Sequence, residues 1–323
     1  MDRRYGGFKI HFSKGSNKLI NNCSPITFCR SCSLRDRSDL SCSVHLYISA
    51  HTWSKIHSPT LSYPGFERSK AFFTVKAGPY TLLTKFSASL TADILGVRYF
   101  AKEFCVIIEK NQVFSITCSP SKSSAIDDVY AFINGIEIVS MPTALYYTPH
   151  GDLGANLVGN KFRFYIDNDT ALEMVHRLNV GGRSILSVED LGMFHMWLDD
   201  KNYFLQSSLL RVSTRNMITY TNIPTYTAPS RVYQTAWAIG SNQQTNQVFN
   251  FTWKLLVDLG FRYLVRLHFC ELEFAIGQKQ FNLLINNKII ETDADVIKWS
   301  SGNGIAVYKD CGNDGRRPIT VPT

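Results

Sequence analysis

The sequence has no long apolar run. Its 323 residues contain no stretch near the roughly 18 consecutive apolar residues that a membrane-spanning helix needs. Positive charges stand close to the first residue, but no apolar segment follows them, so the sequence does not predict a secretory signal peptide. As written, the chain is expected to carry neither an export signal nor a membrane anchor.

Sequence signatures of common catalytic sites are also missing. There is no Gly-x-Ser-x-Gly nucleophile turn, no Walker-type phosphate loop, no His-Glu-x-x-His metal site and no set of kinase motifs. Gly302-Asn-Gly304 lacks the third glycine of a nucleotide-binding loop and predicts a turn. We therefore expect a protein that is not an enzyme and that needs no cofactor.

Acidic residues are scarce in the first 70 positions. That segment holds eleven Lys or Arg residues and four Asp or Glu residues. The rest of the chain holds 23 basic and 22 acidic residues. A nucleic-acid-binding domain concentrates basic charge on its folded part, so the near-neutral remainder argues against a nucleic-acid partner. Hydrophobic residues make up 45% of the chain, which is enough for a packed core and excludes wholesale disorder.

Half of the eight cysteines lie in the basic segment. Cys23, Cys29, Cys32 and Cys42 include one C-x-x-C, but the second pair of a typical zinc site is missing and serine is abundant. We therefore expect residues 1–60 to be an irregular basic Ser/Cys-rich leader rather than a zinc site.

Two other cysteines flank a turn signal. Alternating residues in 99–108 and 113–118 predict a hairpin around Lys110-Asn111. Cys105 and Cys118 would lie in this hairpin. They either form a disulfide in an oxidising compartment or remain buried thiols.

From residue 70 onward the pattern is that of short strands. Alternation or short apolar runs bounded by turn residues predict strands at 71–76, 99–108, 113–118, 129–139, 162–166, 172–180, 232–237, 249–257, 263–272 and 280–287. Helical periodicity is weak, and its best candidate is a short turn at 187–190. Many short strands with frequent turns indicate an all-β sandwich or barrel. A faint repeat at an offset of 208, with Phe73 over Phe281 and Val75 over Leu283, suggests two copies of one sandwich.

Aromatic residues outside the strands are the best binding candidates, because sugar rings stack on flat apolar surfaces. These are Tyr146, Tyr147, Trp197, Tyr203 and Phe204. Each of them either meets a ligand or plugs the end of a sandwich.

Other polar residues have plainer interpretations. On alternation, His268 faces away from Glu271 and Glu273, so a histidine at the edge of the core is favoured over a metal triad. Asp293-Ala-Asp295 resembles a calcium or sugar contact but is better explained as a solvated turn. N-glycosylation sequons begin at Asn22, Asn168 and Asn250, and we expect the last two at the surface.

Several motifs occur in an order that is specific to one family. They are 65–83, 86–93, 130–138, 177–182, 190–200, 263–272, 281–287, 294–299 and 308–310. Together they resemble the tandem malectin-like ectodomain of plant Feronia-type receptor-like kinases, over about residues 64 to 310.

This resemblance implies two tandem, jelly-roll-like β-sandwiches. The first would span 61–168 and be incomplete at its N-terminus, and the second would span 169–323 with its last strand missing or altered. The family resemblance further implies a place at the extracellular face of the plasma membrane, and a ligand that is cell-wall pectin or a secreted rapid alkalinisation factor peptide. A glycosylphosphatidylinositol-anchored co-receptor is the implied partner. The alternatives are a β-sandwich carbohydrate-active enzyme and a truncated, non-functional gene product.

Overall fold

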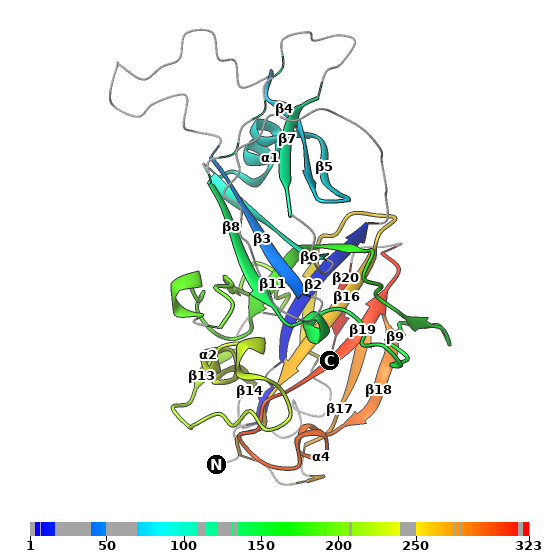
Figure 1. Ribbon diagram of the computed structural model, residues 1–323. Coiled ribbons are helices and arrows are strands. Elements are labelled where there is room, and N and C mark those ends of the chain that lie inside the picture. The colour runs from blue at the N-terminus through cyan, green and yellow to red at the C-terminus, as the bar shows by residue number, and fades with distance from the viewer. Residues whose placement is uncertain are drawn as a thin grey trace. The chain divides into compact units, whose positions relative to one another are not determined.

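The computed structural model describes most of the chain from residue 70 onward and two earlier strand-forming segments (Figure 1). For residues 4–6, 8–16 and 40–49 it describes the backbone alone. The described ranges are 4–6, 8–16, 40–49, 70–97, 99–108, 114–121, 129, 131, 133, 135–190, 192–206, 209–239, 250–273, 276–277, 279–315 and 319–322. The chain divides into two compact units. We name 16–147 with 167–173 the first unit, and 1–15 with 148–166 and 174–323 the second unit.

The first unit is a sandwich of two sheets. Its elements are β3 (Leu40–Ser49), β4 (Phe72–Ala77), β5 (Tyr80–Ser87), α1 (Ala88–Leu95), β6 (Tyr99–Ile108), β7 (Ile116–Pro120), β8 (Gly135–Met141) and the 3-10 turn η2 (Thr143–Leu145). One sheet has the order β6-β3-β8, with the start of β11 paired to β6, and the other has the order β5-β4-β7. Alternate residues of β4, such as Phe73 and Val75, pack against Phe104 and Val106 of β6 to form the core between the sheets.

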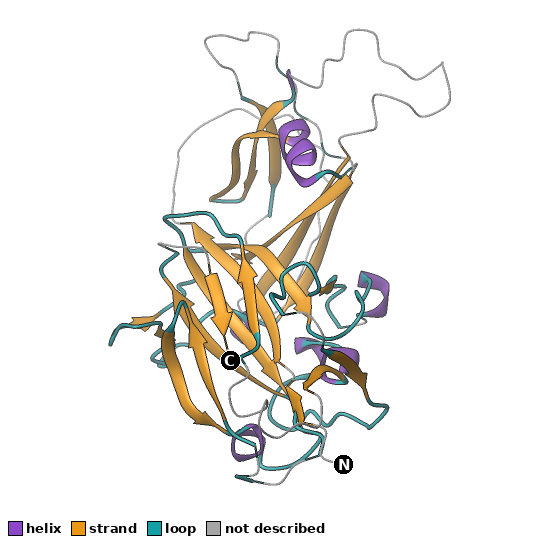
Figure 2. Cartoon of the chain, turned by 180° about the vertical axis from the view of Figure 1, so that it is seen from behind, coloured by secondary structure: helices purple, strands orange, loops and turns teal. Residues whose placement is uncertain are grey.

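The second unit is also built mainly from strands (Figure 2). Its strands are β1 (Arg4–Gly6), β2 (Phe8–Ser16), β9 (Ala155–Leu157), β10 (Arg163–Phe164), β11 (Ala171–Asn179), β12 (Leu198–Asp199), β13 (Leu210–Ser213), β14 (Thr235–Ile239), β15 (Thr252–Leu255), β16 (Arg262–Phe269), β17 (Phe281–Ile285), β18 (Lys288–Ala294), β19 (Val307–Asn313) and β20 (Ile319–Pro322). Its helical turns are η3 (Ser187–Glu189), η4 (Thr225–Thr227), α2 (Ser230–Tyr233) and α4 (Val296–Ser300). β16 is antiparallel to β2 on one side and β19 on the other, and its residues from Tyr263 to Phe269 are buried.

Helices are short throughout the described residues. In this part of the chain, none of them combines the length and the apolar character that crossing a bilayer requires.

The all-β class predicted from the sequence is confirmed, and most predicted strands are present. Gly78 and Pro79 form the turn between β4 and β5, and the helical turn predicted at 187–190 is η3. The predicted hairpin of 99–108 with 113–118 is wrong. β6 pairs with β3 and β11 in one sheet, whereas β7 pairs with β4 in the other. Alternation predicted the strands but held no information on which strand pairs with which.

Two further expectations about the ends of the chain need correction. The irregular leader predicted for residues 1–60 contains the backbone of three strands, since β2 pairs with β16 and β3 pairs with both β6 and β8. Beyond Asp310, where the last strand was expected to be missing or altered, β19 continues to Asn313 and β20 follows, antiparallel to β15. The period-two pattern of Phe8-Lys-Ile-His-Phe12 predicts a strand, and the cysteine and serine content obscured it. The remaining leader cysteines, Cys23, Cys29 and Cys32, lie outside the described residues, as does the sequon at Asn22.

The faint sequence repeat, which lies in β4 and β17, continues through the next three elements. β5 and β18 begin at Tyr80 and Lys288, α1 and α4 begin at Ala88 and Val296, and β6 and β19 begin at Tyr99 and Val307. Each pair of starting positions is 208 residues apart. The helix caps keep the same spacing, because the Ser87 side chain caps α1 and the Asp295 side chain caps α4. A β-hairpin, a capped helix and a strand therefore occur twice in one order and at one spacing.

One buried carboxylate joins several segments of the second unit. Asp200 is fully buried, and its Oδ2 accepts hydrogen bonds from the indole Nε1 of Trp237 and of Trp253, both at 2.8 Å. Its Oδ1 accepts a bond of 3.0 Å from the backbone N–H of Gly181. Gly181 has a φ of +67°, and a Cβ there would lie 2.2 Å from the carbonyl carbon of Ala236, so this turn requires glycine.

We predict that Asp200→Ala lowers the free energy of unfolding by about 3–5 kcal/mol, because three buried N–H groups lose their acceptor. Urea unfolding of the two proteins measures the difference. The matched control is Asp199→Ala, which removes a surface ion pair with Arg211 and is expected to cost at most about 1 kcal/mol. Equal losses in the two variants would contradict a structural role for Asp200.

Candidate functional site

The adjacent tyrosines predicted to bind a ligand are buried in the first unit. Tyr146 is 5% exposed and Tyr147 is 3% exposed. The Tyr147 hydroxyl lies 2.8 Å from the carbonyl oxygen of Cys105 and 2.9 Å from that of Thr170. It therefore ties the segment after β8 to β6 and to the start of β11. These contacts favour the plugging role that the sequence left open.

The three other aromatic candidates are packed in the second unit. Trp197 is 1% exposed, and its ring meets His268 edge to face at 5.5 Å. Phe204 lies over Trp237 and Trp253, with ring centroids 5.0 and 4.7 Å apart. Tyr203 is half-buried and contacts the ring of His176. Ligand contact by these residues stays a prediction, and their burial favours packing.

A buried polar cluster surrounds Trp197. The Asp190 Oδ1 accepts hydrogen bonds from the backbone N–H groups of Gly192 and Met193. Its Oδ2 lies 3.4 Å from Trp197 Nε1 and 3.6 Å from His195 Nδ1. These bonds fix the 190–197 loop from within. Burial raises the pKa of the Asp190 carboxyl, and the hydrogen bonds and the charge of Arg177 oppose that rise.

Neighbouring strands carry a second buried polar group. Arg266 on β16 forms a bidentate ion pair with Asp310 on β19, at 2.8 and 2.7 Å, and lies over the Tyr308 ring. The His268 Nδ1 lies 2.8 Å from the Tyr233 hydroxyl. The core-edge histidine expected from the sequence is therefore a core residue, 1% exposed. Sequence reasoning missed Arg266, because a charged residue in a strand is normally read as solvent-facing.

Of the carboxylate pair expected to form a solvated turn, only Asp293 is exposed, whereas Asp295 is buried. Among the described residues, no group of three or more His, Cys, Asp or Glu side chains is placed to hold a metal ion. Asp295 is 3% exposed and caps α4, accepting the N–H of Lys298, and it also accepts the N–H of Gly277. Asp293 is exposed.

Of the two alternatives left open for Cys105 and Cys118, the structure has free thiols, and no disulfide joins the two. They lie on β6 and β7, which belong to different sheets. Cys105 is buried, and burial raises the pKa of Cys118 to about 11. Asn168 and Asn250, the sequons predicted at the surface, are both exposed, and their glycosylation stays a prediction.

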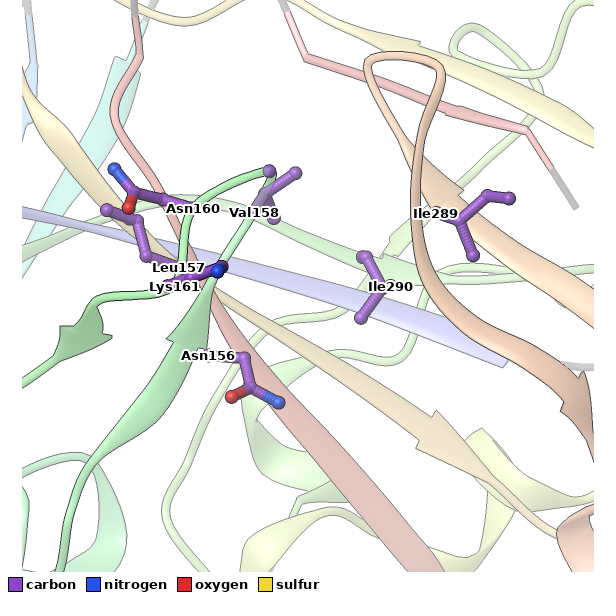
Figure 3. A pocket seen from close by; sticks show the side chains of 8 residues that line it. Asn156, Leu157, Val158, Asn160, Lys161, Ile289 and Ile290 are labelled. Atoms are coloured by element: carbon purple, nitrogen blue, oxygen red, sulfur yellow. The ribbon is translucent and has the colours of Figure 1, made fainter.

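A pocket of the second unit lies between the β9–β10 turn and β18 (Figure 3). Its volume is about 360 Å³. The turn supplies one wall and β18 the other, and the lining residues are Asn156, Leu157, Val158, Gly159, Asn160, Lys161, Ile289 and Ile290. We name it the turn–strand pocket. It combines amide, ammonium and aliphatic groups, which suits a ligand with both polar and apolar faces.

Backbone hydrogen bonds hold the turn of this pocket. The N–H of Leu157 donates to the carbonyl of Phe162, and the N–H of Val158 donates to the carbonyl of Gly312 on β19. Opposite, Asn286 and Asn287 have φ values of +51° and +60° and form the tight turn between β17 and β18. No local sequence pattern predicts the pocket, because its two walls are more than 100 residues apart.

We predict that Asp190 makes the stability depend on pH. Its pKa is raised in the folded state, so its protonated form favours folding. This contribution is present below the pKa that Asp190 has in the unfolded chain. It is lost as the pH rises through the pKa that Asp190 has in the folded protein. Asp190→Asn removes it. Urea unfolding from about pH 4 to pH 7 should show wild type losing stability relative to this variant. If the difference in free energy of unfolding between wild type and Asp190→Asn does not change with pH, the prediction is contradicted. The control is Asp169→Asn, which changes an aspartate at an exposed site.

Comparison with known proteins identifies relatives over most of the chain. Receptor-like protein kinase FERONIA of Arabidopsis thaliana is 44% identical over 256 residues, which cover 77% of this chain and 28% of that protein. ANXUR1 of the same plant is 37% identical over 273 residues, covering 80% of this chain and 31% of ANXUR1. The chain thus spans less than a third of the length of these two relatives.

Solved structures agree with these relatives. The crystal structure of the ANXUR1 extracellular domain from Arabidopsis thaliana matches with a TM-score of 0.76 at 32% identity, covering 98% of this chain and 76% of that one. FER, in the crystal structure of the plant peptide RALF23 in complex with FER and LLG2, matches with a TM-score of 0.75 at 38% identity. That match covers 88% of this chain and 72% of the other. The malectin-like domain matches residues 75–317, and the chain belongs to this family.

Proposed function

We propose that this chain is the extracellular ligand-recognition region of a plant receptor-like kinase. In this role it binds a secreted peptide of the rapid alkalinisation factor type, together with a glycosylphosphatidylinositol-anchored co-receptor, in cell-wall and growth signalling. The observation that carries the proposal is the likeness to FER in its complex with RALF23 and LLG2, which extends over 88% of this chain.

We further propose that the two units are tandem copies of one malectin-like sandwich. The support is the constant spacing of 208 residues between the hairpin, capped helix and strand of the two units. Two copies offer two sets of loops, which suits a protein that binds more than one partner at once.

Cell-wall polysaccharide, pectin in particular, is a second candidate ligand. The turn–strand pocket favours it, because Asn156, Asn160 and Lys161 present groups that bind sugar hydroxyls and carboxylates. The same pocket gives no support to a carbohydrate-active enzyme. Glycoside hydrolysis needs a pair of carboxyl groups, and none of the eight described residues that line the pocket is Asp or Glu.

We predict that the purified 323-residue chain binds RALF23 in the presence of LLG2, with a dissociation constant within about tenfold of that of the FERONIA extracellular region. Isothermal titration calorimetry measures both proteins side by side, with FERONIA as the positive control. The peptide with its residues in scrambled order is the negative control. Binding by FERONIA without binding by this chain would overturn the peptide proposal.

A further inference from the structure

We propose that an exposed apolar surface of the second unit docks a protein segment that carries apolar side chains beside an acidic one. The surface consists of Leu186, Val188, Phe194, Met196 and Leu198, and we name it the outer row. The inference goes beyond the proposed function, and it does not depend on which peptide or co-receptor the chain binds.

The outer row gathers exposed apolar side chains in one short segment. Residues 186–198 expose five large apolar side chains, with exposed fractions from 37% for Leu198 to 70% for Val188. Single apolar residues scattered over a protein surface need no explanation. A group of them rimmed by charged residues is typical of a surface that contacts a partner.

Backbone pairing brings the two ends of this segment together. Ile185 and Trp197 pair in antiparallel fashion, and the N–H of each donates to the carbonyl of the other, at 2.8 and 3.0 Å. The next residues along the two strands, Leu186 and Met196, are therefore cross-strand neighbours. Ile185 and Trp197 are buried, so Leu186 and Met196 face solvent on the opposite side of the pair.

The buried side of the segment fixes its exposed side. From residue 193 to residue 198, buried and exposed positions alternate. The buried members are Met193, His195 and Trp197, and the exposed members belong to the outer row. Asp190 holds the buried side through the N–H of Met193 and the indole of Trp197. The outer row is therefore fixed in position before a partner arrives, which lowers the entropy cost of binding.

Phe194 has a backbone conformation that its side chain disfavours. Its φ is +57°, and its N–H donates to the carbonyl of Asp190 at 2.9 Å. Glycine, asparagine and aspartate adopt positive φ most readily, whereas a bulky residue there is an outlier. This conformation leaves the aromatic ring 41% exposed. Backbone strain is concentrated at functional sites, so a strained residue that exposes apolar surface supports a contact with a partner.

Two arginines at the rim of the outer row favour an acidic partner. Arg183 and Arg231 both bond to the carboxylate of Glu189, so two guanidinium groups share one carboxylate. The two arginine side chains are 70% and 50% exposed. A guanidinium group has five N–H donors, and the donors turned to solvent suit a carboxylate of a partner.

The same charge argues against pairing between two copies of the chain. Asp190 and Asp200 are buried and bonded from within the core. Asp199 is paired with Arg211, and Lys201 is exposed. The surface around the outer row therefore has a surplus of positive charge. A two-fold contact between copies would place this surplus against itself, whereas an acidic segment of another protein meets opposite charge.

A lipid surface suits the outer row less well than a protein does. Glu189 lies in the same rim, and the phosphate groups of lipids would oppose its carboxylate. The helical turn within the row, η3, is three residues long, whereas helices that lie in a membrane interface are usually far longer. A protein segment can place a donor opposite Glu189 and a carboxylate opposite the arginines.

The test selects peptides on the full 323-residue chain from a phage-displayed library of random peptides of about 12 residues, a length that holds several apolar anchors. We expect the enriched peptides to combine large apolar residues with Asp or Glu. Isothermal titration calorimetry then measures synthetic copies of them. Leu186→Ser/Met196→Ser should weaken their binding about tenfold or more, because two central apolar contacts are lost. Arg183→Gln/Arg231→Gln should weaken it about threefold or more, because charge-assisted bonds are lost.

The matched control is Leu256→Ser/Leu259→Ser, which removes two apolar side chains that are 71% and 64% exposed outside the outer row. The control should bind the peptides as wild type does, and circular dichroism checks that all variants are folded. Phe194→Gly should also weaken peptide binding, but its urea midpoint should equal or exceed that of wild type, because glycine adopts a positive φ without strain. A clear fall of that midpoint would make Phe194 a packing residue and overturn its part in the outer row.

The remaining outcomes contradict the proposal. Equal affinities of the outer-row variant and the control variant would show that the peptides bind elsewhere. Enrichment of basic peptides, or of none, would overturn the acidic partner. Binding to vesicles of phosphatidylcholine and phosphatidylserine that the outer-row variant loses would assign the surface to lipid instead. Dimerisation in sedimentation velocity experiments that the same variant loses would assign it to a second copy.

Discussion

The second unit depends on the buried carboxylate of Asp200. A charge without partners in a protein interior is costly, so this side chain is tolerated only because three N–H groups converge on it. Those groups come from the turn after β11, from β14 and from β15, and Phe204 packs against both indoles that donate to Asp200. One short turn after β12 therefore sets the relative positions of three strands and of the aromatic core between them.

The sequence was most informative about what each segment does locally. The strand predicted at 99–108 has the same bounds as β6, and the helical turn predicted at 187–190 is η3. The sequence was least informative about which strands pair with each other, because strand pairing depends on contacts between distant residues. The β6–β7 hairpin was wrong for this reason, and the helix α1, whose buried face is made of small residues, was missed because it lacks a strong apolar stripe.

The candidate binding residues were also difficult to judge from local sequence alone. Tyr147 and Trp197 stand in loop-like sequence, but the structure buries both, since a loop can pass through the end of a sandwich. Asp190 and Asp200, which hold these regions together, carried no distinctive signal, because a single aspartate between strands is ordinarily a surface turn residue. The turn–strand pocket is lined by residues 156–161 and 289–290, which are far apart in the sequence, so no local pattern reveals it.

The convergence of indoles on Asp200 has a spectroscopic consequence. The chain has five tryptophans, and two of them donate to this one carboxylate. A third, Trp197, lies beside the carboxylate of Asp190 in the same unit. Among the described residues the first unit contains no tryptophan. Four of the five tryptophans belong to the second unit, and the fifth, Trp53, lies outside the described residues in the range of the first unit. The intrinsic fluorescence of the protein therefore reports chiefly on the second unit.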